Sequence, residues 1–310
     1  MPLTVFVAGR INYDTIIHVG GVFERGKKFV GRIVAEGVGG TGANIAISMA
    51  RAGTRDVKLF GAIGHDLKDF IIGFLRSEGV GTEHIVVVDK ATGRAYVFID
   101  DYGESTIVSI PSANNELDIP HIPQEIEKAL AMVVANIPKH VAVEILSRFR
   151  GSTVFMDPGN IWNPLEIANK IQYECFIMPN ENEYLHYIRT RNSNIAEDPK
   201  PNCIIIVKRG EKGATLYDYK KGRVMEVNAL PLKKLGLRPY STSGCGDVFT
   251  GVFATVYLEK RRVSEALVYA SIAAGLKATR IPSYDSPKRE ELERFVEKYS
   301  SIININESRI

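Results

Sequence analysis

Apolar residues along the chain occur as short continuous runs that alternate with stretches of helical periodicity. Buried strands are predicted at 5–9, 57–60, 153–156, 175–178 and 204–207, and helices at 43–52, 67–77, 248–258 and 264–278. Ser264 is placed to cap the last of these helices. Short apolar strands alternating with helices are typical of a mostly parallel sheet with helices on both faces. The sequence therefore predicts a single α/β domain over residues 1–310.

Two early segments have a different pattern, in which polar and apolar residues alternate with a period of two. The segment 13–19 continues into 28–35, and 94–99 pairs naturally with 106–110 across a turn. Such alternation is typical of strands with one solvated face. We expect a small antiparallel sheet, formed by about 12–36 and 92–110, that is inserted in the domain as a lid.

The charge balance of the chain excludes some classes of partner. Lys and Arg number 39 against 36 Asp and Glu, a formal net charge of +3. This balance argues against a nucleic-acid binder or a membrane-surface protein, so an anion needs a local site. The absence of a long apolar run or a signal-peptide pattern predicts a cytoplasmic protein. Three scattered cysteines predict no disulfide framework: Cys175, Cys203 and Cys245.

The segment 37–42 contains the spacing G-x-G-x-x-G between a predicted strand and a predicted helix. This spacing is typical of dinucleotide binding, and Asp66 lies roughly where a ribose-binding acid falls. However, the preceding strand is alternating and half exposed, whereas the first strand of a dinucleotide-binding unit is buried. An NAD(P)-dependent oxidoreductase that uses the segment from Gly37 to Gly42 is the alternative hypothesis from another enzyme class.

The segment 241–247 reads Ser-Thr-Ser-Gly-Cys-Gly-Asp and runs directly into a predicted helix. Backbone N–H groups at a helix start have no partner within the helix, and the helix dipole adds positive potential there. We therefore predict an anion hole at Gly244, Cys245 and Gly246. Asp247 could simply cap the helix, but the flanking glycines indicate close approach to a ligand. An anion hole beside a carboxylate suits phosphoryl transfer to an alcohol, with Asp247 as the base.

These residues resemble the signature of the ribokinase-like (PfkB) family of sugar and nucleoside kinases, usually Asp-Thr-x-Gly-Ala-Gly-Asp. The likeness extends along nearly the whole chain. The segment 9–14 looks like the family's first strand and the acid that binds substrate hydroxyls. The segment 39–44 is similar to its Gly-Gly-x-x-x-Asn motif, and 110–114 to a Gly-Ala-Asn stretch. The resemblance implies a ribokinase-like fold and an acceptor bound by Asn12, Asp14, Gly39, Gly40, Asn44 and Asn114.

Two further segments resemble the nucleotide side of the family. Residues 180–183 look like the Asn-x-x-Glu motif that organises Mg²⁺ and phosphate, which implies that Glu183 acts on Mg²⁺ through water. The turn 208–214 resembles the family's Lys-x-Gly-x-x-Gly turn. The resemblance thus implies Mg²⁺ as cofactor and ATP, or alternatively ADP, as donor, bound by Asn180, Lys208, Gly210, Gly213, Thr242 and Ser271. Ser241 replaces the family's usual Asp, which in some members helps to hold a monovalent cation, so dependence on K⁺ stays open.

The expected acceptor is a small ribose-like sugar, either free or within a nucleoside. Aromatic residues of the lid that could stack a base are Phe23, Phe29 and Tyr96. A sugar phosphate is an alternative acceptor, because three basic residues could meet a second phosphate: Arg10, Lys27 and Arg94. The exposed strands of the lid also predict a homodimer formed through the lid.

Overall fold

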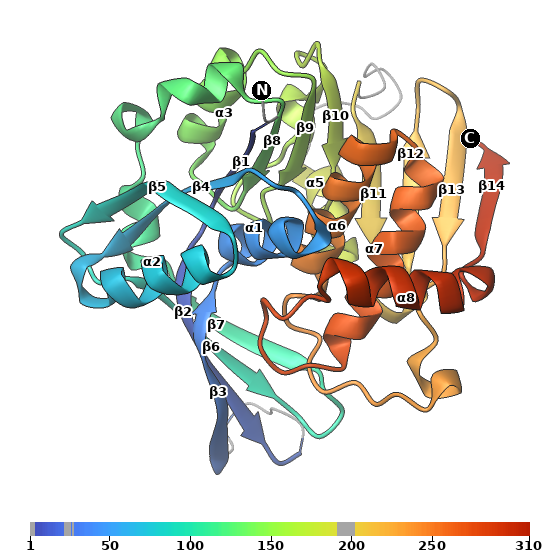
Figure 1. Ribbon diagram of the computed structural model, residues 1–310, viewed down its shortest axis with the longest axis horizontal. Helices are drawn as coiled ribbons and strands as arrows, with labels where there is room; N and C mark the ends of the chain where they lie inside the picture. Colours follow the sequence, from blue (N-terminus) through green and yellow to red (C-terminus); the bar gives the residue numbers. More distant parts are fainter. Residues whose placement is uncertain (1–3, 22–25, 27, 191–201) are drawn as a thin grey trace.

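A ten-stranded sheet with the order β14-β13-β12-β11-β10-β9-β8-β1-β4-β5 runs through the molecule (Figure 1). We describe it from a computed structural model, in which residues 4–21, 26, 28–190 and 202–310 are placed. Its strands are β1 (Val5–Gly9), β4 (Val57–Gly64), β5 (Val80–Val88), β8 (Ala131–Ala135), β9 (Thr153–Asp157), β10 (Glu174–Ile177), β11 (Ile204–Lys208), β12 (Ala214–Asp218), β13 (Arg223–Val227) and β14 (Ile305–Arg309). Pairing is parallel from β5 to β11 and antiparallel from β11 to β14. The predicted mostly parallel sheet is confirmed.

Helices cover both faces of this sheet because its strands are apolar on both sides. Within β1, Val5 and Val7 belong to one core, whereas Phe6 and Ala8 belong to the other. The first core also takes residues from α1 (Thr41–Ala52), α2 (Lys68–Ser77), α6 (Cys245–Lys260), α7 (Val263–Ala278) and α8 (Arg289–Tyr299). The second takes residues from α3 (Lys139–Arg148), α4 (Leu165–Ala168) and α5 (Glu181–Thr190). No helix in the part of the chain that is placed is long and apolar enough to cross a membrane.

Two helix starts decide whether a predicted cap is correct. Helix α6 begins at Cys245 instead of 248, because Gly244 adopts φ +79° and acts as the N-cap. Asp247 therefore lies inside the first turn, and the alternative interpretation of Asp247 as a helix cap is wrong. Helix α7 begins at Val263 with Arg262 as its N-cap, so Ser264 is a residue of the first turn and not the predicted cap.

A second, four-stranded sheet has the order β3-β2-β6-β7. Its strands are β2 (Asn12–Val19), β3 (Gly31–Gly39), β6 (Gly93–Ile99) and β7 (Ser105–Ile110). Two antiparallel hairpins are present as predicted, but the central pair β2–β6 is parallel. The expectation of a fully antiparallel sheet is wrong because β2 and β6 are each the first strand of a hairpin, and both hairpins project in the same direction (Figure 1).

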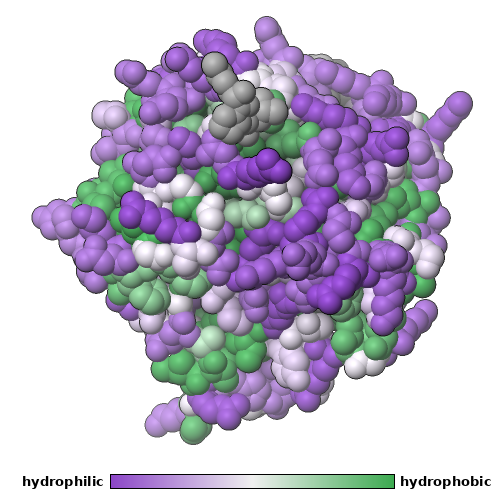
Figure 2. Space-filling model, in the orientation of Figure 1, coloured by the Kyte–Doolittle hydropathy of each residue, from purple (hydrophilic) through white to green (hydrophobic). Residues whose placement is uncertain are grey.

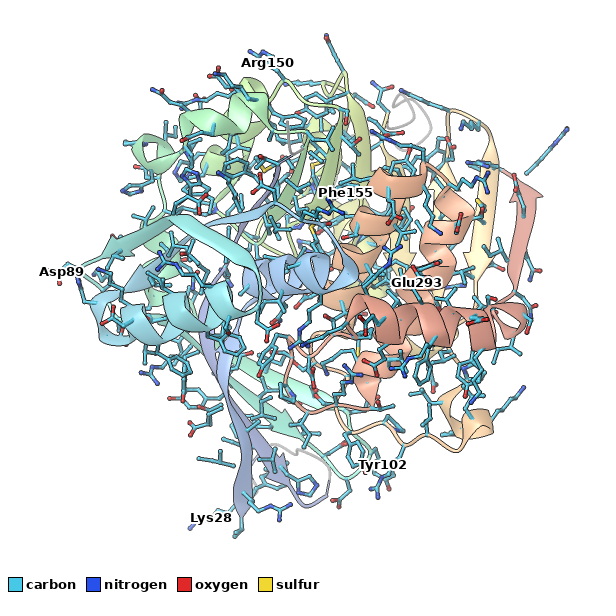
Figure 3. The ribbon with its side chains drawn as sticks, viewed as in Figure 1. Lys28, Asp89, Tyr102, Arg150, Phe155 and Glu293 are labelled. Carbon is cyan, nitrogen blue, oxygen red and sulfur yellow. A yellow bond between two sulfur atoms is a disulfide. The ribbon has the colours of Figure 1, made fainter. Side chains whose placement is uncertain are left out.

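The small sheet has one buried apolar face and several exposed apolar residues. The buried residues Ile16, Ala95, Val97 and Ile99 form a separate core cluster. The exposed ones are Ile33, Ile107, Val108 and Ile110, and Val30, directly before β3, is exposed as well. Figure 2 shows apolar surface at the lower end of the molecule, where this sheet lies. In Figure 3, Lys28 and Tyr102 mark the free ends of the two hairpins.

Cys175 of β10 and Cys203, just before β11, form a disulfide with a Cα–Cα distance of 4.7 Å. The expectation that no disulfide forms is therefore wrong. The two cysteines are 28 residues apart in the sequence, but β10 and β11 are neighbours in the sheet. Cys245 is the free cysteine.

Candidate active site

A cavity of about 290 Å³ lies between the two sheets, beside the N-terminal ends of α1 and α6. Its lining residues are Arg10, Asn12, Asp14, Gly40, Thr41, Asn44, Ala95, Val97, Ile107, Ser109, Asn136, Ser243, Gly244 and Asp247. Arg10 and Asn136 directly follow the carboxyl ends of β1 and β8, where parallel sheets place their ligands. Strands β6 and β7 supply one wall, so the small sheet closes this side of the cavity.

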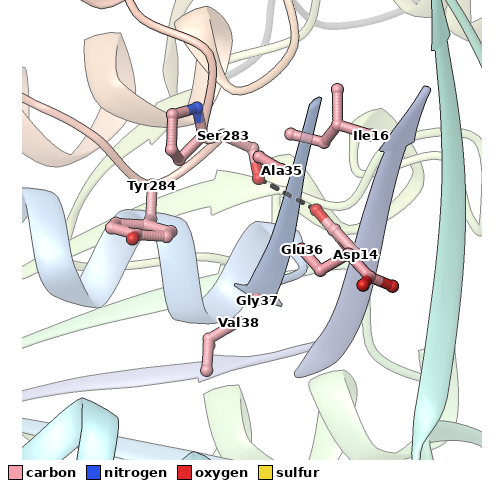
Figure 4. A pocket seen from close by; sticks show the side chains of 9 residues that line it. Asp14, Ile16, Ala35, Glu36, Gly37, Val38, Ser283 and Tyr284 are labelled. Atoms are coloured by element: carbon pink, nitrogen blue, oxygen red, sulfur yellow. Dashed lines mark hydrogen bonds between the residues drawn. The ribbon is translucent and has the colours of Figure 1, made fainter. Parts of the chain in front are cut away.

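Asp14 projects from β2 into this region and its side chain is largely buried. The Ser283 hydroxyl donates a hydrogen bond to Asp14 Oδ2 at 2.9 Å (Figure 4), whereas Oδ1 is buried and accepts none within the placed residues. Burial raises the pKa of Asp14 to about 6, although the Ser283 hydroxyl opposes this shift. Gly39 leaves the space for the carboxylate, since a Cβ there would lie 1.9 Å from Asp14 Oδ2. The free oxygen is a ready acceptor for a ligand hydroxyl.

Asp247 and Asn44 bring α6 and α1 together at the cavity. Asn44 Nδ2 donates to Asp247 Oδ2 at 2.7 Å, while Asn44 Oδ1 is buried and accepts no hydrogen bond from the placed residues. Burial, and next the negative charge of Asp157, raise the pKa of Asp247 to about 7 against the opposing effects of Asn44 and Lys208. A carboxylate with a pKa near neutrality is suited to take a proton.

At the turn that leads into α6, some of the N–H groups predicted to bind an anion are free, but one of them already has a partner. The N–H of Cys245 donates to the Thr242 carbonyl at 3.2 Å, so its predicted place in the anion hole is already taken. The N–H groups of Gly246 and Asp247 have no backbone acceptor among the residues that are placed. Gly244 must be glycine, because φ is +79° and a Cβ would lie 2.0 Å from the Ser283 carbonyl oxygen. The N–H groups of Gly246 and Asp247 thus remain without a backbone partner at the start of α6, whereas that of Cys245 does not.

Lys208 lies beneath this turn, in a buried polar network that the sequence analysis did not foresee. Its Nζ donates to Asp157 Oδ2 at 2.5 Å and lies 3.3 Å from Thr250 Oγ1, which itself donates to Asp157 at 2.8 Å. Burial alone would lower the pKa of Lys208, but the charges of Asp157 and Glu183 hold it above its ordinary value. The overlooked signal for Asp157 was an acidic residue directly at the carboxyl end of a buried strand.

Asn180 and Glu183 bind each other at the start of α5. The N–H of Asn180 donates to Glu183 Oε2 at 2.8 Å, and the N–H of Glu183 donates to Asn180 Oδ1 at 2.9 Å. Burial raises the pKa of Glu183, and the charge of Asp157 adds to this effect. Across the placed residues, no group of three or more His, Cys, Asp or Glu is arranged to hold a metal ion. A direct carboxylate cage is therefore not present in this part of the chain.

Three further predicted residues do not line the cavity and instead bind neighbouring segments of the chain. Asn114 accepts from the Ile11 N–H at 2.9 Å and donates to Asn12 Oδ1 at 3.0 Å, so its amide secures the connection between β1 and β2. Ser271 donates to the Asn228 carbonyl at 2.7 Å. Thr242 contacts the small sheet, with its N–H 3.2 Å from the Gly103 carbonyl oxygen.

The glycine turn after β11 is tight. Gly210 and Gly213 have φ of +55° and +88°, and the Gly213 N–H donates to the Gly210 carbonyl at 3.0 Å. A Cβ on Gly213 would lie 1.9 Å from the Val227 carbonyl oxygen. This turn holds β11 and β12 together, and it follows Lys208 of the buried network directly.

The basic residues predicted for a second phosphate separate in space. Arg10 lines the cavity, and burial lowers its pKa. Arg94 lies over the Tyr13 ring at 5.6 Å and 3.7 Å from Asp66. Lys27 and Phe23 lie outside the described residues.

The oxidoreductase hypothesis requires residues 37–42 to follow a strand of the parallel sheet. Residues 37–39 are instead the last residues of β3, and residues 40–42 follow it. Strand β3 belongs to the small sheet. Asp66 accepts hydrogen bonds from the Thr92 N–H at 2.9 Å and the Thr92 hydroxyl at 2.6 Å, so it stabilises a turn. This arrangement differs from a dinucleotide-binding unit.

Comparison with known proteins identifies the family. The model of the pfkB family of carbohydrate kinases matches residues 3–289. The ribokinase of Lactococcus lactis is 26% identical over 302 residues, covering 93% of this chain and 95% of its own. An ATP-dependent ribose-1-phosphate kinase of Halopiger xanaduensis is 23% identical over 304 residues, covering 94% and 97%. A Cryptococcus neoformans ribokinase structure in complex with ADP has a TM-score of 0.81 at 25% identity, covering 94% of this chain and 99% of that one. Because the family match spans nearly the whole chain, the protein belongs to the pfkB carbohydrate kinases, phosphotransferases that act on an alcohol group.

Proposed function

We propose that this protein transfers the γ-phosphoryl group of ATP to a hydroxyl of a free ribose-like sugar, with Asp247 as the general base. The observation that carries the proposal is the half-buried Asp247 carboxylate, which lines the cavity at the start of α6 beside free N–H groups. The carboxylate removes the proton of the acceptor hydroxyl, while the N–H groups of Gly246 and Asp247 stabilise negative charge on the transferred group.

The acceptor is oriented by buried oxygen atoms that lack partners. Asp14 Oδ1 and Asn44 Oδ1 accept no hydrogen bond from the placed residues and belong to side chains that line the cavity. A polyol supplies the hydroxyl donors that these atoms need, since a buried polar atom without a partner is costly. Among the described residues, those that line the cavity include no aromatic residue, so this lining offers a nucleoside base no stacking partner. These features favour a free sugar over a nucleoside.

The charged side chains around Asp247, three carboxyl groups and one ammonium group, fit a hydrated Mg²⁺ ion. Asp157, Glu183 and Asp247 are three carboxyl groups that affect one another electrostatically, and Lys208 is the ammonium among them. Oxygen ligands and retained water are typical of Mg²⁺ in nucleotide sites. Glu183 and Asp157 would hold the ion through water, and the ion would neutralise charge on the donor phosphates.

A sugar phosphate is the second candidate acceptor. Arg10 lines the cavity and makes no ion pair with the placed residues, so its guanidinium is available for a phosphate. The similarity to a ribose-1-phosphate kinase agrees with this candidate.

The deciding experiment incubates the purified protein with Mg·ATP or Mg·ADP and one acceptor at a time. The acceptors are ribose, deoxyribose, ribose 1-phosphate, hexoses and nucleosides, and product is detected by mass. We expect ribose or deoxyribose to give the highest kcat/KM. Preference for ribose 1-phosphate would support the second candidate, and the absence of any phosphorylated product would refute the proposal.

The activity should depend on pH in the way that Asp247 requires. The base is active only when ionised, and the pKa of Asp247 is raised to about 7. We therefore expect kcat/KM to rise with pH through about 7 and then to reach a plateau. A profile that is flat between pH 5.5 and 8.5, measured with a pH-insensitive assay of ADP release, would contradict the role of Asp247.

We also propose a homodimer formed through the small sheet. Its edge strands β3 and β7 carry exposed apolar residues, among them Ile33 and Val108. A second copy of the chain would cover both the apolar surface and an open strand edge. Sedimentation equilibrium should give twice the chain mass, and Val108→Lys should shift it toward the monomer. A monomer of the unchanged protein at micromolar concentration would refute this proposal.

A further inference from the structure

Lys277 is a buried ammonium group that the proposed reaction does not use. It lies in α7 with 0% of its surface exposed. Its Nζ donates to the backbone carbonyls of Ser241 at 3.2 Å and Arg280 at 3.1 Å. No carboxylate in the placed residues lies within ion-pair distance of it. The group is thus held by carbonyl oxygens and not by an acid.

Such a position is unfavourable unless the charge has a role. Transfer of an unpaired ammonium into the protein interior costs several kcal/mol, and a methionine would fill similar space without that cost. Burial accordingly lowers the pKa of Lys277, while the charges of Cys245, Asp285 and Asp247 act in the opposite direction. Cys245 and Asp247 lie in the first turn of α6, and Ser241, whose carbonyl Lys277 binds at 3.2 Å, lies four residues before that helix.

The two carbonyls that Lys277 binds belong to the segments on either side of the anion-binding turn. Ser241 begins the segment that leads to Gly244. Arg280 begins the segment that leads to Ser283. The carbonyl oxygen of Ser283 lies close to Gly244, since a Cβ added to Gly244 would be 2.0 Å from it. Ser283 also donates to Asp14. Lys277 therefore fixes two segments that shape both the phosphate side and the acceptor side of the cavity.

We propose that the Lys277 ammonium is a built-in monovalent cation that positions the anion-binding turn and makes phosphoryl transfer independent of added K⁺. The inference rests on the proposed function of the same site. Two converging carbonyl oxygens are ligands that a free monovalent cation would use, and the covalently attached ammonium occupies that place. Ser241 carries no charge, so no acid at this position competes for the ammonium or requires a free cation.

The test compares salts at equal ionic strength. The unchanged protein should have the same kcat in chlorides of K⁺, Na⁺ and tetramethylammonium. Lys277→Met should lower kcat by about tenfold or more, as expected when a preorganised charge near the developing negative charge is removed. Lys277→Ala leaves space for an ion, so K⁺ or NH₄⁺ should restore part of its kcat while tetramethylammonium should not. Lys288→Met, which removes an exposed lysine before α8, should behave like the unchanged protein.

Two outcomes would overturn the inference. One is a requirement of the unchanged protein for K⁺, which needs no variant and so holds even if the variants fail to fold. The other is a folded Lys277→Ala protein whose kcat is equally low in all salts, because a merely structural lysine would give that result. Thermal unfolding monitored by circular dichroism establishes that the variants are folded.

Nucleotide binding separates this inference from the proposed function. Calorimetric titration with Mg·ATP in tetramethylammonium buffer needs no acceptor, and Lys277→Met should bind more weakly than the unchanged protein. If no acceptor is phosphorylated but this difference is present, the acceptor assignment fails and the Lys277 inference stands. If both proteins bind Mg·ATP equally and neither is active, the inference fails as well.

Discussion

Asp247→Asn is expected to lower kcat by about 10²- to 10⁴-fold, the usual contribution of a positioned general base. The asparagine side chain has nearly the same shape but cannot accept the proton of the acceptor hydroxyl. Its carbonyl oxygen can still accept the hydrogen bond that Asn44 Nδ2 donates at 2.7 Å, so the packing of α1 on α6 is kept. KM for the acceptor should change little, because Asp14 and the free oxygen of Asn44 remain.

The same substitution should not destabilise the fold at alkaline pH. The pKa of Asp247 is raised by folding to about 7, so its ionised form is disfavoured in the native state and the stability of the protein falls as pH rises through 7. Asn removes that charge, and Asp247→Asn should therefore unfold at the same or a higher temperature than the unchanged protein at pH 8. Asp89→Asn, at an exposed position labelled in Figure 3, is the matched control and should keep full kcat. A kcat of Asp247→Asn within tenfold of the unchanged protein would exclude a base at this position.

Lys208→Met is expected to reduce the free energy of unfolding at pH 8 by about 3–5 kcal/mol, as for breaking a buried ion pair by removal of one partner. Lys208 and Asp157 have side-chain exposures of only 11% and 6%, so solvent cannot replace the lost ammonium. Without it, Asp157 keeps the hydrogen bond from Thr250 but carries an uncompensated buried charge beside Glu183 and Asp247. The loss should be smaller at pH 5, because Asp247 and Glu183, whose pKa values burial raises, are then more protonated and repel Asp157 less.

The control for this prediction removes both partners. The double variant Asp157→Asn/Lys208→Met removes both charges of the ion pair. It should recover much of the lost stability, since the large cost comes from a buried charge that is left without its partner. Urea unfolding of both variants and of Asp157→Asn gives the coupling energy between the two side chains. A Lys208→Met protein that loses less than about 1 kcal/mol, the value of a surface pair, would show that the network is solvated in solution.

The sequence by itself determined the layered fold and part of the site. Apolar runs alternating with helical periodicity require a sheet that is covered on both faces, and the structure has one. The alternating segments required a separate half-exposed sheet. The motif around Asp247 indicated a carboxylate at an anion-binding helix start, because local backbone geometry follows from the local sequence of small residues. Asp247 was predicted from its local motif, and Asp14, Gly40 and Asn44 from the resemblance to the ribokinase-like family; all four line one cavity.

What only the tertiary structure decided depends on contacts between segments distant in sequence. The pairing of Cys175 with Cys203 follows from neighbouring strands, and the parallel β2–β6 pair follows from the direction in which two hairpins project. The network that joins Lys208 to Asp157, 51 residues away, could not be predicted from either local segment. Lys277 could not be distinguished from any other lysine of an apolar helix, because its burial and its contact with the Ser241 carbonyl, 36 residues away, arise only in the folded chain. Local pattern fixes which elements form, whereas the electrostatic environment of a side chain is the sum of everything that packs around it.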